Sequence, residues 1–490
     1  MTPEAETVPA LLALRAKADP DVRAIVADGE SATYAELDAA GTALATRLVA
    51  AGVVKGDRVG LLAPNGVEWA VIAYAALRIG AVLVPLSTLL RPPELAAQLA
   101  TAHVSHLVAV PEVRGRRPLD GLDTAGLPSL RAVWPTGGIP EAAAPEALVQ
   151  AMEARVRPAD DLTVLFTSGS TGPPKGVIHT HGGAIRATAA GLDLRGVGPG
   201  ERLYVPMPFF WTGGFGTGLL ATLIAGATLL TEAAPEPART LDLLQRERVT
   251  LFRGWPDQAK QLAAHPAFAT ADLSSLGDGS LGDLLPPERR PAPGARPNLF
   301  GMTETFGPYC GERLDTDLPP GKHGSCGRPF PGTEVRIGDT GEIEVRGPNL
   351  FRGICGRTRP SVFSADGWYR TGDGGRLDVD GYLWFEGRLD DMFKVKGASV
   401  YPSEVEAALR SLDGVRQVHV TEVAGEVGAA VVTDTSPATL AAAARQRLSS
   451  FKVPTRWFVT ADAGRIPVTA TGKVDKAALR ALLAAGEEGT

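Results

Sequence analysis

The sequence is poor in the residues that build covalent or metal-bound frameworks. It has 490 residues but only three cysteines and seven histidines. Cys310, Cys326 and Cys355 are too few and too widely spaced for a disulfide framework or a zinc ribbon, and the histidines lack the spacing of metal ligands. We therefore expect the cysteines to be packing residues in a reducing compartment and the histidines to have structural roles.

A long apolar run and an excess of positive charge are also missing. The longest apolar run, residues 217–230, is too short to span a bilayer and is interrupted by Gly and Thr. The first six residues carry acid where a signal peptide needs basic residues. The formal net charge of −6 removes a general attraction to nucleic acid or to an anionic membrane. These features predict a cytoplasmic protein with no nucleic-acid or membrane partner, in which any phosphate site is local.

The apolar content, by contrast, suffices for large cores. The chain is 44% hydrophobic and 21% charged, and it is longer than one ordinary domain. Apolar spacing predicts helices over residues 34–51 and 67–79 and strands over 58–63 and 81–86, and the same alternation returns between residues 162 and 252. Strands that alternate with helices indicate an α/β fold with parallel or mixed sheets covered by helices.

The character of the sequence changes near residue 332. Short alternating stretches separated by Gly and Asp predict a β-rich subdomain with strands at residues 333–337, 341–346 and 381–385. The Pro-, Ala- and Arg-rich stretches at residues 111–160 and 285–297 are expected to be surface loops.

The last hundred residues have elements of their own. Apolar spacing predicts helices at residues 403–412 and 437–448 and strands at residues 415–420 and 428–432. A segment of this size can fold alone. We therefore place two domains, residues 1–389 and residues 390–490.

The strongest chemical signal is a loop of small residues, Leu165-Phe-Thr-Ser-Gly-Ser-Thr-Gly-Pro-Pro-Lys-Gly-Val177. An apolar strand leads into it, and backbone N–H groups and hydroxyls can close around phosphate oxygens with the cation of Lys175 nearby. It is not a Walker A loop, because Lys175 is preceded by Pro174 and followed by Gly176. On this stretch alone, a flexible Ser/Gly loop remains an alternative.

This loop resembles the phosphate loop of the adenylate-forming superfamily, which includes acyl-CoA synthetases, amino-acid adenylation domains and firefly luciferase. Further motifs match in the order of that family: Asn298-Leu-Phe-Gly-Met-Thr-Glu304, Gly341-Glu-Ile-Glu-Val-Arg-Gly347, Gly367-Trp-Tyr-Arg-Thr-Gly-Asp373, Gly387-Arg-Leu-Asp-Asp-Met-Phe-Lys-Val-Lys-Gly397, Tyr401-Pro-Ser-Glu-Val-Glu406 and Pro467-Val-Thr-Ala-Thr-Gly-Lys473. The resemblance implies a large N-terminal adenylation domain, residues 1–389, and a small mobile α+β domain, residues 390–490.

The same resemblance implies an activity. An acid would react with ATP to give acyl-AMP and pyrophosphate, and the acyl group would then pass to a thiol, that of coenzyme A. In the first step a carboxylate approaches the α-phosphate of ATP, and both are anionic. The protein must therefore neutralise charge where it develops. The implied cofactors and substrates are ATP, Mg²⁺ and coenzyme A.

Residue roles follow from the matching motifs. The resemblance assigns nucleotide binding to Thr167, Ser168, Gly169, Ser170, Thr171, Gly172, Lys175, Phe300, Gly301, Met302, Asp373 and Arg388. Residues 168–172 and Lys175 would hold the β- and γ-phosphates, and Phe300 would stack on adenine in place of the tyrosine of most relatives. Asp373 would accept both ribose hydroxyls, and Arg388 would lie near the ribose and phosphate.

Catalysis is assigned to three residues. Thr303 would contact the α-phosphate, Glu304 would help to hold Mg²⁺, and Lys473 would bridge the substrate carboxylate and the α-phosphate. Asp390 matches the hinge of the C-terminal domain, and Gly397 would face the pantetheine tunnel. Taken singly, each of these residues has a simpler reading as a cap, a turn residue or a surface charge.

The acyl pocket is predicted from the segment 205–215. It would be lined by Phe209, Phe210, Trp211, Gly213 and Gly214, although the three aromatic residues are equally compatible with a core. Amino-acid-activating relatives place an Asp after the Phe to pair the substrate ammonium, and no acid stands there in this chain. A buried ammonium would lack a partner, so we expect an apolar acid that is fatty, aromatic or alicyclic.

Two alternatives stay open. A stand-alone enzyme that loads a carrier-protein phosphopantetheine arm would have the same motifs. A non-catalytic nucleotide-binding regulatory relative is disfavoured because Glu304, Asp373, Arg388 and Lys473 are all intact. The segment 276–281 departs from the family pattern, so no adenine contacts are carried over to it.

Overall fold

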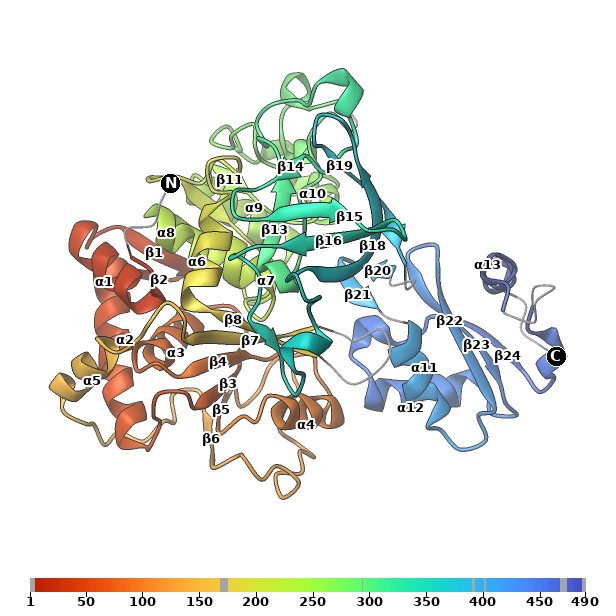
Figure 1. Cartoon of the computed structure of the whole chain (residues 1–490), viewed down its shortest axis with the longest axis horizontal. Coiled ribbons are helices and arrows are strands. Elements are labelled where there is room, and N and C mark those ends of the chain that lie inside the picture. Colours follow the sequence, from red (N-terminus) through yellow and green to blue (C-terminus); the bar gives the residue numbers. More distant parts are fainter. Residues whose placement is uncertain are drawn as a thin grey trace.

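A computed structural model describes residues 5–167, 175–292, 294–389, 393–400, 402–467 and 474–486. For residues 257, 386–388, 399 and 403 it describes the backbone alone. Figure 1 shows a large body formed by the N-terminal part of the chain, with a smaller C-terminal part beside it.

A seven-stranded sheet forms the lower half of the large body in Figure 1. Its strands are, in spatial order, β17 (Gly353–Ile354), β8 (Lys175–Thr180), β7 (Asp161–Thr167), β4 (Val82–Pro85), β3 (Arg58–Leu62), β5 (His106–Ala109) and β6 (Ala132–Pro135). Strands β7, β4, β3, β5 and β6 are parallel, whereas β8 runs antiparallel to β7 and to β17.

A five-stranded sheet lies in the other half of that body. Its order is β11 (Leu251–Phe252), β9 (Arg202–Tyr204), β10 (Thr228–Thr231), β1 (Arg23–Ala27) and β2 (Glu30–Thr33), and it is parallel except for β2. Successive residues of a strand point to opposite faces of the sheet, so neighbouring residues pack in different cores. Ile25 packs in the core between the two sheets, and Val26 packs on the outer face.

Helices cover both faces of both sheets. The core between the sheets contains residues of α1 (Val8–Ala18), α2 (Tyr34–Ala50), α3 (Val67–Arg78), α6 (His181–Ala189) and α8 (Ala221–Ala225). The outer faces are covered by α4 (Pro92–Thr101) on the seven-stranded sheet and by α9 (Pro237–Arg246) and α10 (Pro256–Ala263) on the five-stranded sheet. The predicted α/β layers are confirmed.

Helix α2 shows how the sequence determines where a helix begins and which of its faces is buried. Thr33 caps its N-terminus by accepting a hydrogen bond from the backbone N–H of Glu36, whose carboxylate accepts one from the N–H of Thr33 in return. This reciprocal pair satisfies donors that the first helical turn leaves free. Leu37, Ala45 and Leu48 then face the core, as the helical period of the sequence predicts.

The β-rich region predicted after residue 332 is also confirmed. An antiparallel sheet contains β15 (Glu334–Ile337), β16 (Glu342–Arg346), β18 (Tyr369–Leu377) and β19 (Leu383–Arg388). A second antiparallel sheet contains β12 (Phe300–Met302), β13 (Gly307–Gly311) and β14 (Arg328–Pro329). Cys310 and Cys326 are free and buried in the core under these sheets, as expected for packing residues.

The C-terminal part has its own cores. Its elements are the hairpin β20 (Phe393–Val395) and β21 (Ala398–Val400), the sheet β22 (Gln417–Val423), β23 (Glu426–Val432) and β24 (Arg456–Thr460), and helices α11 (Pro402–Arg410), α12 (Pro437–Arg447) and α13 (Lys476–Ala485). The two apolar clusters of this part contain only residues from 393 onward. The predicted helices and strands of this region are confirmed.

The prediction of surface loops over residues 111–160 is wrong in part. Strand β6 and helix α5 (Glu146–Glu153) lie within it. Both are weakly patterned because β6 alternates between half-buried and exposed residues at the sheet edge, and Val149 is the buried residue of α5. In the part of the chain that the structure describes, none of the helices has the length and apolar character needed to traverse a lipid bilayer.

Candidate active site

The hairpin formed by β7 and β8 positions both ends of the predicted phosphate loop. Thr167 and Lys175 are cross-strand partners in this antiparallel pair. Gly176 next to them is tightly packed, because an added Cβ would lie 3.0 Å from Cys355 Sγ and 2.9 Å from Val164 Cγ1. The predicted phosphate-binding residues Ser168, Gly169, Ser170, Thr171 and Gly172 lie outside the described residues.

His179, four residues beyond Lys175, joins this hairpin to the predicted catalytic turn. Its Nε2 lies 2.8 Å from the carbonyl oxygen of Thr303, so the imidazole donates this hydrogen bond. Its ring also meets the ring of Phe306 edge-on at 4.8 Å. Burial lowers the pKa of His179 to about 3, so the ring is neutral at neutral pH. A neutral buried histidine therefore fixes the backbone of Thr303.

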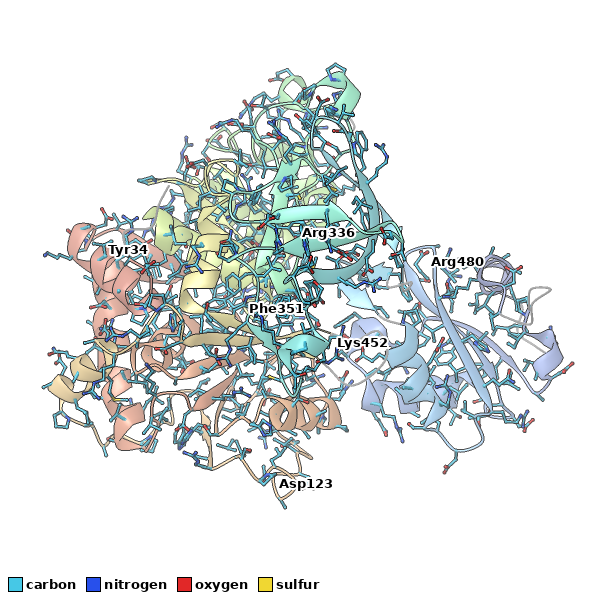
Figure 2. The ribbon with its side chains drawn as sticks, viewed as in Figure 1. Tyr34, Asp123, Arg336, Phe351, Lys452 and Arg480 are labelled. Atoms are coloured by element: carbon cyan, nitrogen blue, oxygen red, sulfur yellow. The ribbon has the colours of Figure 1, made fainter. Side chains whose placement is uncertain are left out.

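Glu304 lies in this turn, and its carboxylate is held in one orientation. It is buried, and the hydroxyl of Tyr369 donates a hydrogen bond of 3.0 Å to Oε1. The carbonyl oxygen of Glu304 accepts a hydrogen bond of 2.9 Å from the backbone N–H of Phe351. The ring of Phe351, labelled in Figure 2, meets Tyr369 edge-on at 4.9 Å. Strand β18 thus holds the carboxylate of Glu304, and the segment after β16 holds its backbone.

The predicted adenine-binding segment is strand β12. The ring of Phe300 lies 5.0 Å from that of Phe385 and 5.5 Å from that of Tyr309. Gly301 has no space for a side chain, because a Cβ there would lie 2.2 Å from the carbonyl oxygen of Gly307. Met302 pairs with Gly307 across the hairpin.

Asp373, the predicted ribose ligand, lies in the middle of β18. It is buried, and its backbone N–H donates a 3.0 Å hydrogen bond to the Thr371 hydroxyl. It pairs in register with Arg388 of β19, of which the backbone alone is described. Burial, with the nearby Cys310 and Asp373, raises the pKa of Tyr309 well above its ordinary value. Tyr309 therefore contacts the ring of Phe300 and also interacts electrostatically with Asp373.

Asn65 fixes the loop of the predicted acyl pocket. Its side-chain oxygen accepts a 2.8 Å hydrogen bond from the backbone N–H of Phe209. Its amide group donates to the Met207 carbonyl oxygen at 3.0 Å and to the Thr231 hydroxyl at 2.9 Å. Both polar atoms of this buried amide are thus used, with two hydrogen bonds to the loop that leads to Trp211 and one to β10.

The aromatic residues of that loop have different neighbours. Phe209 is fully buried and contacts Trp69 edge-on at 4.9 Å within the core between the sheets. Phe210 contacts Trp211 at 5.3 Å, and Trp211 contacts Trp255 at 5.8 Å. Trp211 and Trp255 are only half-buried. The loop therefore sends one ring into the core and another toward Trp255.

Glycines let the following helical segment approach closely. It comprises α7 (Thr212–Gly214) and a π-helical turn, Phe215–Leu220. A Cβ on Gly213 would lie 2.6 Å from Met207 Sδ, and one on Gly214 would lie 2.2 Å from the Pro208 carbonyl oxygen. π-Helical turns are frequent at functional sites because they redirect side chains within a helix.

Among the described residues, the C-terminal part contacts the large body near Trp255 and near Glu94. Gly397, in the β20–β21 turn, lies against the indole of Trp255. Lys452, labelled at the junction in Figure 2, lies 3.5 Å from Glu94 Oε1 in the large body and 2.6 Å from Glu404 Oε1 in α11. The predicted hinge Asp390 and the predicted catalytic Lys473 lie outside the described residues.

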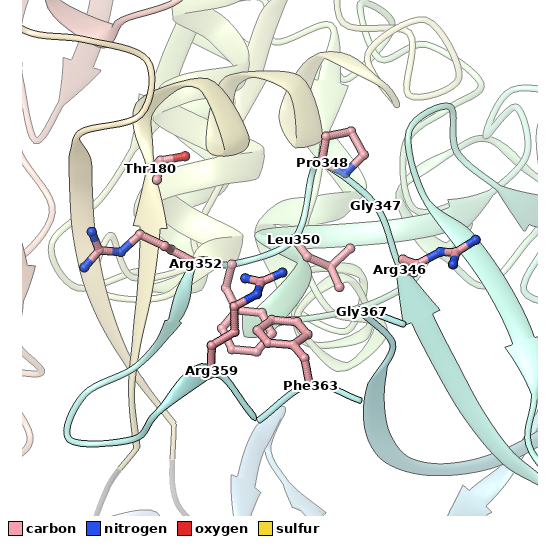
Figure 3. Close-up of a pocket in the computed structure, with 10 residues that line it drawn as sticks. Thr180, Arg346, Gly347, Pro348, Leu350, Arg352, Arg359, Phe363 and Gly367 are labelled. Atoms are coloured by element: carbon pink, nitrogen blue, oxygen red, sulfur yellow. The ribbon is translucent and has the colours of Figure 1, made fainter. Parts of the chain in front are cut away.

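A separate pocket of about 410 Å³ is lined in part by Phe351, whose backbone N–H donates to the carbonyl oxygen of Glu304. Figure 3 shows Arg346, Arg352 and Arg359 around it, with Phe363 on its floor. Arg346 is paired with Glu334, Arg352 with Asp161, and Arg359 stacks on Phe363. None of the predicted site residues that the structure describes lines this pocket. Within the described ranges, no group of three or more His, Cys, Asp or Glu side chains is placed to hold a metal ion.

Comparison with known proteins decides the family. Residues 12–355 match the model of the AMP-binding enzyme family. The chain belongs to the AMP-binding enzyme family. Among curated members, it is 35% identical to 3-[(3aS,4S,7aS)-7a-methyl-1,5-dioxo-octahydro-1H-inden-4-yl]propanoyl:CoA ligase of Mycobacterium tuberculosis, over 98% of this chain and 100% of that protein. It is 34% identical to feruloyl-CoA synthase of Amycolatopsis sp, over 95% of this chain and 97% of the relative.

A solved structure of the same fold extends the comparison. The amide bond synthetase McbA from Marinactinospora thermotolerans superposes with a TM-score of 0.78, at 29% identity, over 96% of this chain and 99% of that one. The match spans both the large body and the C-terminal part of this AMP-binding enzyme. It confirms the fold that the motifs imply.

Sequence reasoning missed several residues that shape this site. His179, Asn65, Tyr369 and Trp255 act through contacts with residues distant in sequence. Tyr369 lies inside the motif Gly367-Trp-Tyr-Arg-Thr-Gly-Asp373, which was a signal for its importance. The other three carry no local signal that separates them from core residues.

Proposed function

We propose that this AMP-binding enzyme is an ATP-dependent acid:CoA ligase that acts on an apolar carboxylic acid. The observation that carries the proposal is the full-length similarity to acid:CoA ligases, two of which act on a ring-bearing propanoate and on ferulate by their names. The half-buried Trp211 beside Phe210 supports an apolar acid. Alicyclic, aromatic and fatty acids are the candidate substrates.

In the first half-reaction, a carboxylate oxygen of the acid attacks the α-phosphorus of ATP, and the bond from that phosphorus to the pyrophosphate oxygen breaks. Thr303 would contact the α-phosphate, and Lys473 would neutralise charge between the two anions. Residues 168–172 and Lys175 would hold the leaving pyrophosphate. Asp373, with Arg388 beside it, would bind the ribose.

A magnesium ion fits the chemistry of Glu304. Mg²⁺ prefers one or two carboxylates together with phosphate and water oxygens, so a single well-oriented carboxylate is sufficient. The Tyr369 hydroxyl holds Glu304 Oε1 in place, which supports this role. The ion would neutralise phosphate charge when it is bound.

In the second half-reaction, the sulfur of coenzyme A attacks the acyl carbon. The bond from that carbon to the AMP oxygen breaks, AMP leaves with the bonding electrons, and the thiol proton passes to solvent. We place the boundary of the mobile domain at residues 389 and 390, with Asp390 as the hinge. Two separate apolar clusters from residue 393 onward support a domain that moves as a unit.

The test is a screen of carboxylic acids for pyrophosphate release, with and without coenzyme A. A matched pair sharpens it: 3-phenylpropanoate and phenylalanine differ in one ammonium group. We expect 3-phenylpropanoate to be preferred by more than about 100-fold, because a buried ammonium has no partner.

The acceptor is decided by the product. Thioester formation with free coenzyme A supports the proposal. Turnover that requires a phosphopantetheinylated carrier protein would support the carrier-loading alternative. No pyrophosphate release with any acid would contradict both and favour a non-catalytic nucleotide-binding protein.

A further inference from the structure

Trp255 lies between the predicted acyl pocket and the C-terminal part. It follows β11 and directly precedes α10. Its backbone is fixed, because its N–H donates a 2.9 Å hydrogen bond to Gln258 Oε1 and its carbonyl oxygen accepts a 3.0 Å one from the N–H of Gln258. These two hydrogen bonds fix the base from which the indole projects.

One side of the indole contacts the pocket loop. The rings of Trp255 and Trp211 are 5.8 Å apart and inclined at 77°. This edge-to-face arrangement is the favoured geometry of an aromatic pair. Because Asn65 fixes the start of the same loop through Phe209, the orientation of Trp211 is set by the large body.

The indole also contacts the C-terminal part. A Cβ added to Gly397 would lie 2.9 Å from both Cδ2 and Cε2 of Trp255, which is closer than a real Cβ can come. Gly397 has φ of +82°, a conformation that side chains other than glycine rarely adopt. The backbone of the turn therefore contacts the indole at Gly397, with no side chain between them.

We propose that Trp255 is a positioning residue that couples the size of the acyl group to the docking of the β20–β21 hairpin for thioester formation. This inference rests on the proposed acid:CoA ligase activity. The indole contacts Trp211 of the predicted acyl pocket and is also the surface that Gly397 contacts. An acyl group that displaces the indole is adenylated but transferred poorly to the thiol.

The first test separates the two half-reactions in Trp255→Ala and Trp255→Phe. Adenylation is followed by ATP–pyrophosphate exchange, and transfer is followed by thioester formation from preformed acyl-AMP, with 3-phenylpropanoate and bulkier 4-substituted analogues as probes. We expect the transfer rate to fall about tenfold in Trp255→Ala, which removes the ring, and about threefold in Trp255→Phe, which keeps part of the ring surface. Trp255→Ala should also adenylate the bulkier acids better than the wild type does.

Trp134→Ala is the matched control. It removes an indole from β6, at the edge of the seven-stranded sheet farthest from β8 and β17. Its ratio of transfer to adenylation should equal that of the wild type. A merely structural loss in Trp255→Ala would lower both half-reactions together, which would overturn the proposal.

The second test uses rescue. Gly397→Ala should impair transfer because the new methyl group collides with the indole. If that collision is the cause, the double variant Trp255→Ala, Gly397→Ala should transfer faster than Gly397→Ala alone, although the positive φ still limits the recovery. Additive losses in the double variant would contradict the proposed contact.

These outcomes are distinct from failure of the proposed function. If the wild type forms no adenylate with any acid, the ligase proposal itself fails. If the wild type forms thioester and Trp255→Ala keeps both the transfer rate and the acid preference of the wild type, the ligase proposal stands and the role of Trp255 is refuted.

Discussion

The turn that carries Glu304 and the junction with the C-terminal part are held by different kinds of contact. Glu304 is fixed by hydrogen bonds from Tyr369 and Phe351, which belong to the same large body. The junction uses the contact of Trp255 with Gly397 and, around Glu94, the ion pair of Lys452 and hydrogen bonds from Ser449.

The difference matches what each region must do. Hydrogen bonds within one body keep a charge-handling group in place through both half-reactions. A buried ion pair stabilises weakly, because the loss of hydration offsets much of the attraction. The contact between Lys452 and Glu94 therefore suits a surface that must separate and form again. Four predictions, at Lys473, Glu304, His179 and Glu94, test this comparison.

The largest effect is expected at Lys473, which the mobile part would bring to the nucleotide. Lys473→Ala should lower adenylation by about 1,000-fold, because a cation between two anions is lost. Transfer from preformed acyl-AMP to coenzyme A should be largely spared. Pyrophosphate exchange and thioester formation measure the two steps, and equal loss in both would count against the assigned role.

The next largest effect is expected at Glu304, in the turn that hydrogen bonds hold within the large body. Glu304→Gln should lower adenylation by about 100-fold, and Tyr369→Phe, which removes one hydrogen bond to it, by about tenfold. Exchange kinetics over a range of Mg²⁺ concentrations test this. If Tyr369→Phe were as damaging as Glu304→Gln, the hydroxyl would have a role beyond orienting the carboxylate.

His179 should make the stability of the large body sensitive to acid. Its pKa is about 3 in the folded chain and near 6.5 in the unfolded chain, so below pH 6.5 the unfolded chain binds a proton that the folded chain does not. The unfolding free energy should therefore fall by about 2 kcal/mol from this residue between pH 7 and pH 5. Urea unfolding at both pH values should show a smaller fall in His179→Gln, and an unchanged fall would refute this source of acid sensitivity.

The smallest effect is expected at the junction. Glu94→Gln should slow thioester formation by about fivefold to tenfold while leaving adenylation unchanged, because it weakens the contacts that Lys452 and Ser449 of the C-terminal part make with the large body. Glu404→Gln is the matched control, since it weakens the contact of the same lysine inside the C-terminal part. If both variants behaved alike in the two half-reactions, the ion pair would have no role in docking.

The sequence predicted those elements whose side chains are strongly patterned. The helix at residues 34–51 and the strand at residues 58–63 have continuous apolar faces, and both are found within a residue of their predicted ends. Strand β6 and helix α5 were missed because their apolar residues do not follow their burial: all four residues of β6 are apolar although two are exposed, and α5 buries only Val149.

The candidate site was predictable only where a motif lies within one segment. Thr303 and Glu304 follow from such a motif, whereas His179 and Trp255 gain their roles from partners more than 40 residues away in the chain. Periodicity within a segment carries no information on which turn a buried histidine will meet. These contacts required the fold.

The most direct measurement follows one oxygen atom. With 3-phenylpropanoate labelled with oxygen-18 in its carboxylate, the account predicts that AMP gains a single labelled oxygen, because the carboxylate oxygen stays on the α-phosphorus when the thiol displaces AMP. Mass spectrometry of AMP and of the thioester reads out the result. Label absent from AMP and present in inorganic phosphate, with ADP as the nucleotide product, would contradict an acyl-AMP intermediate.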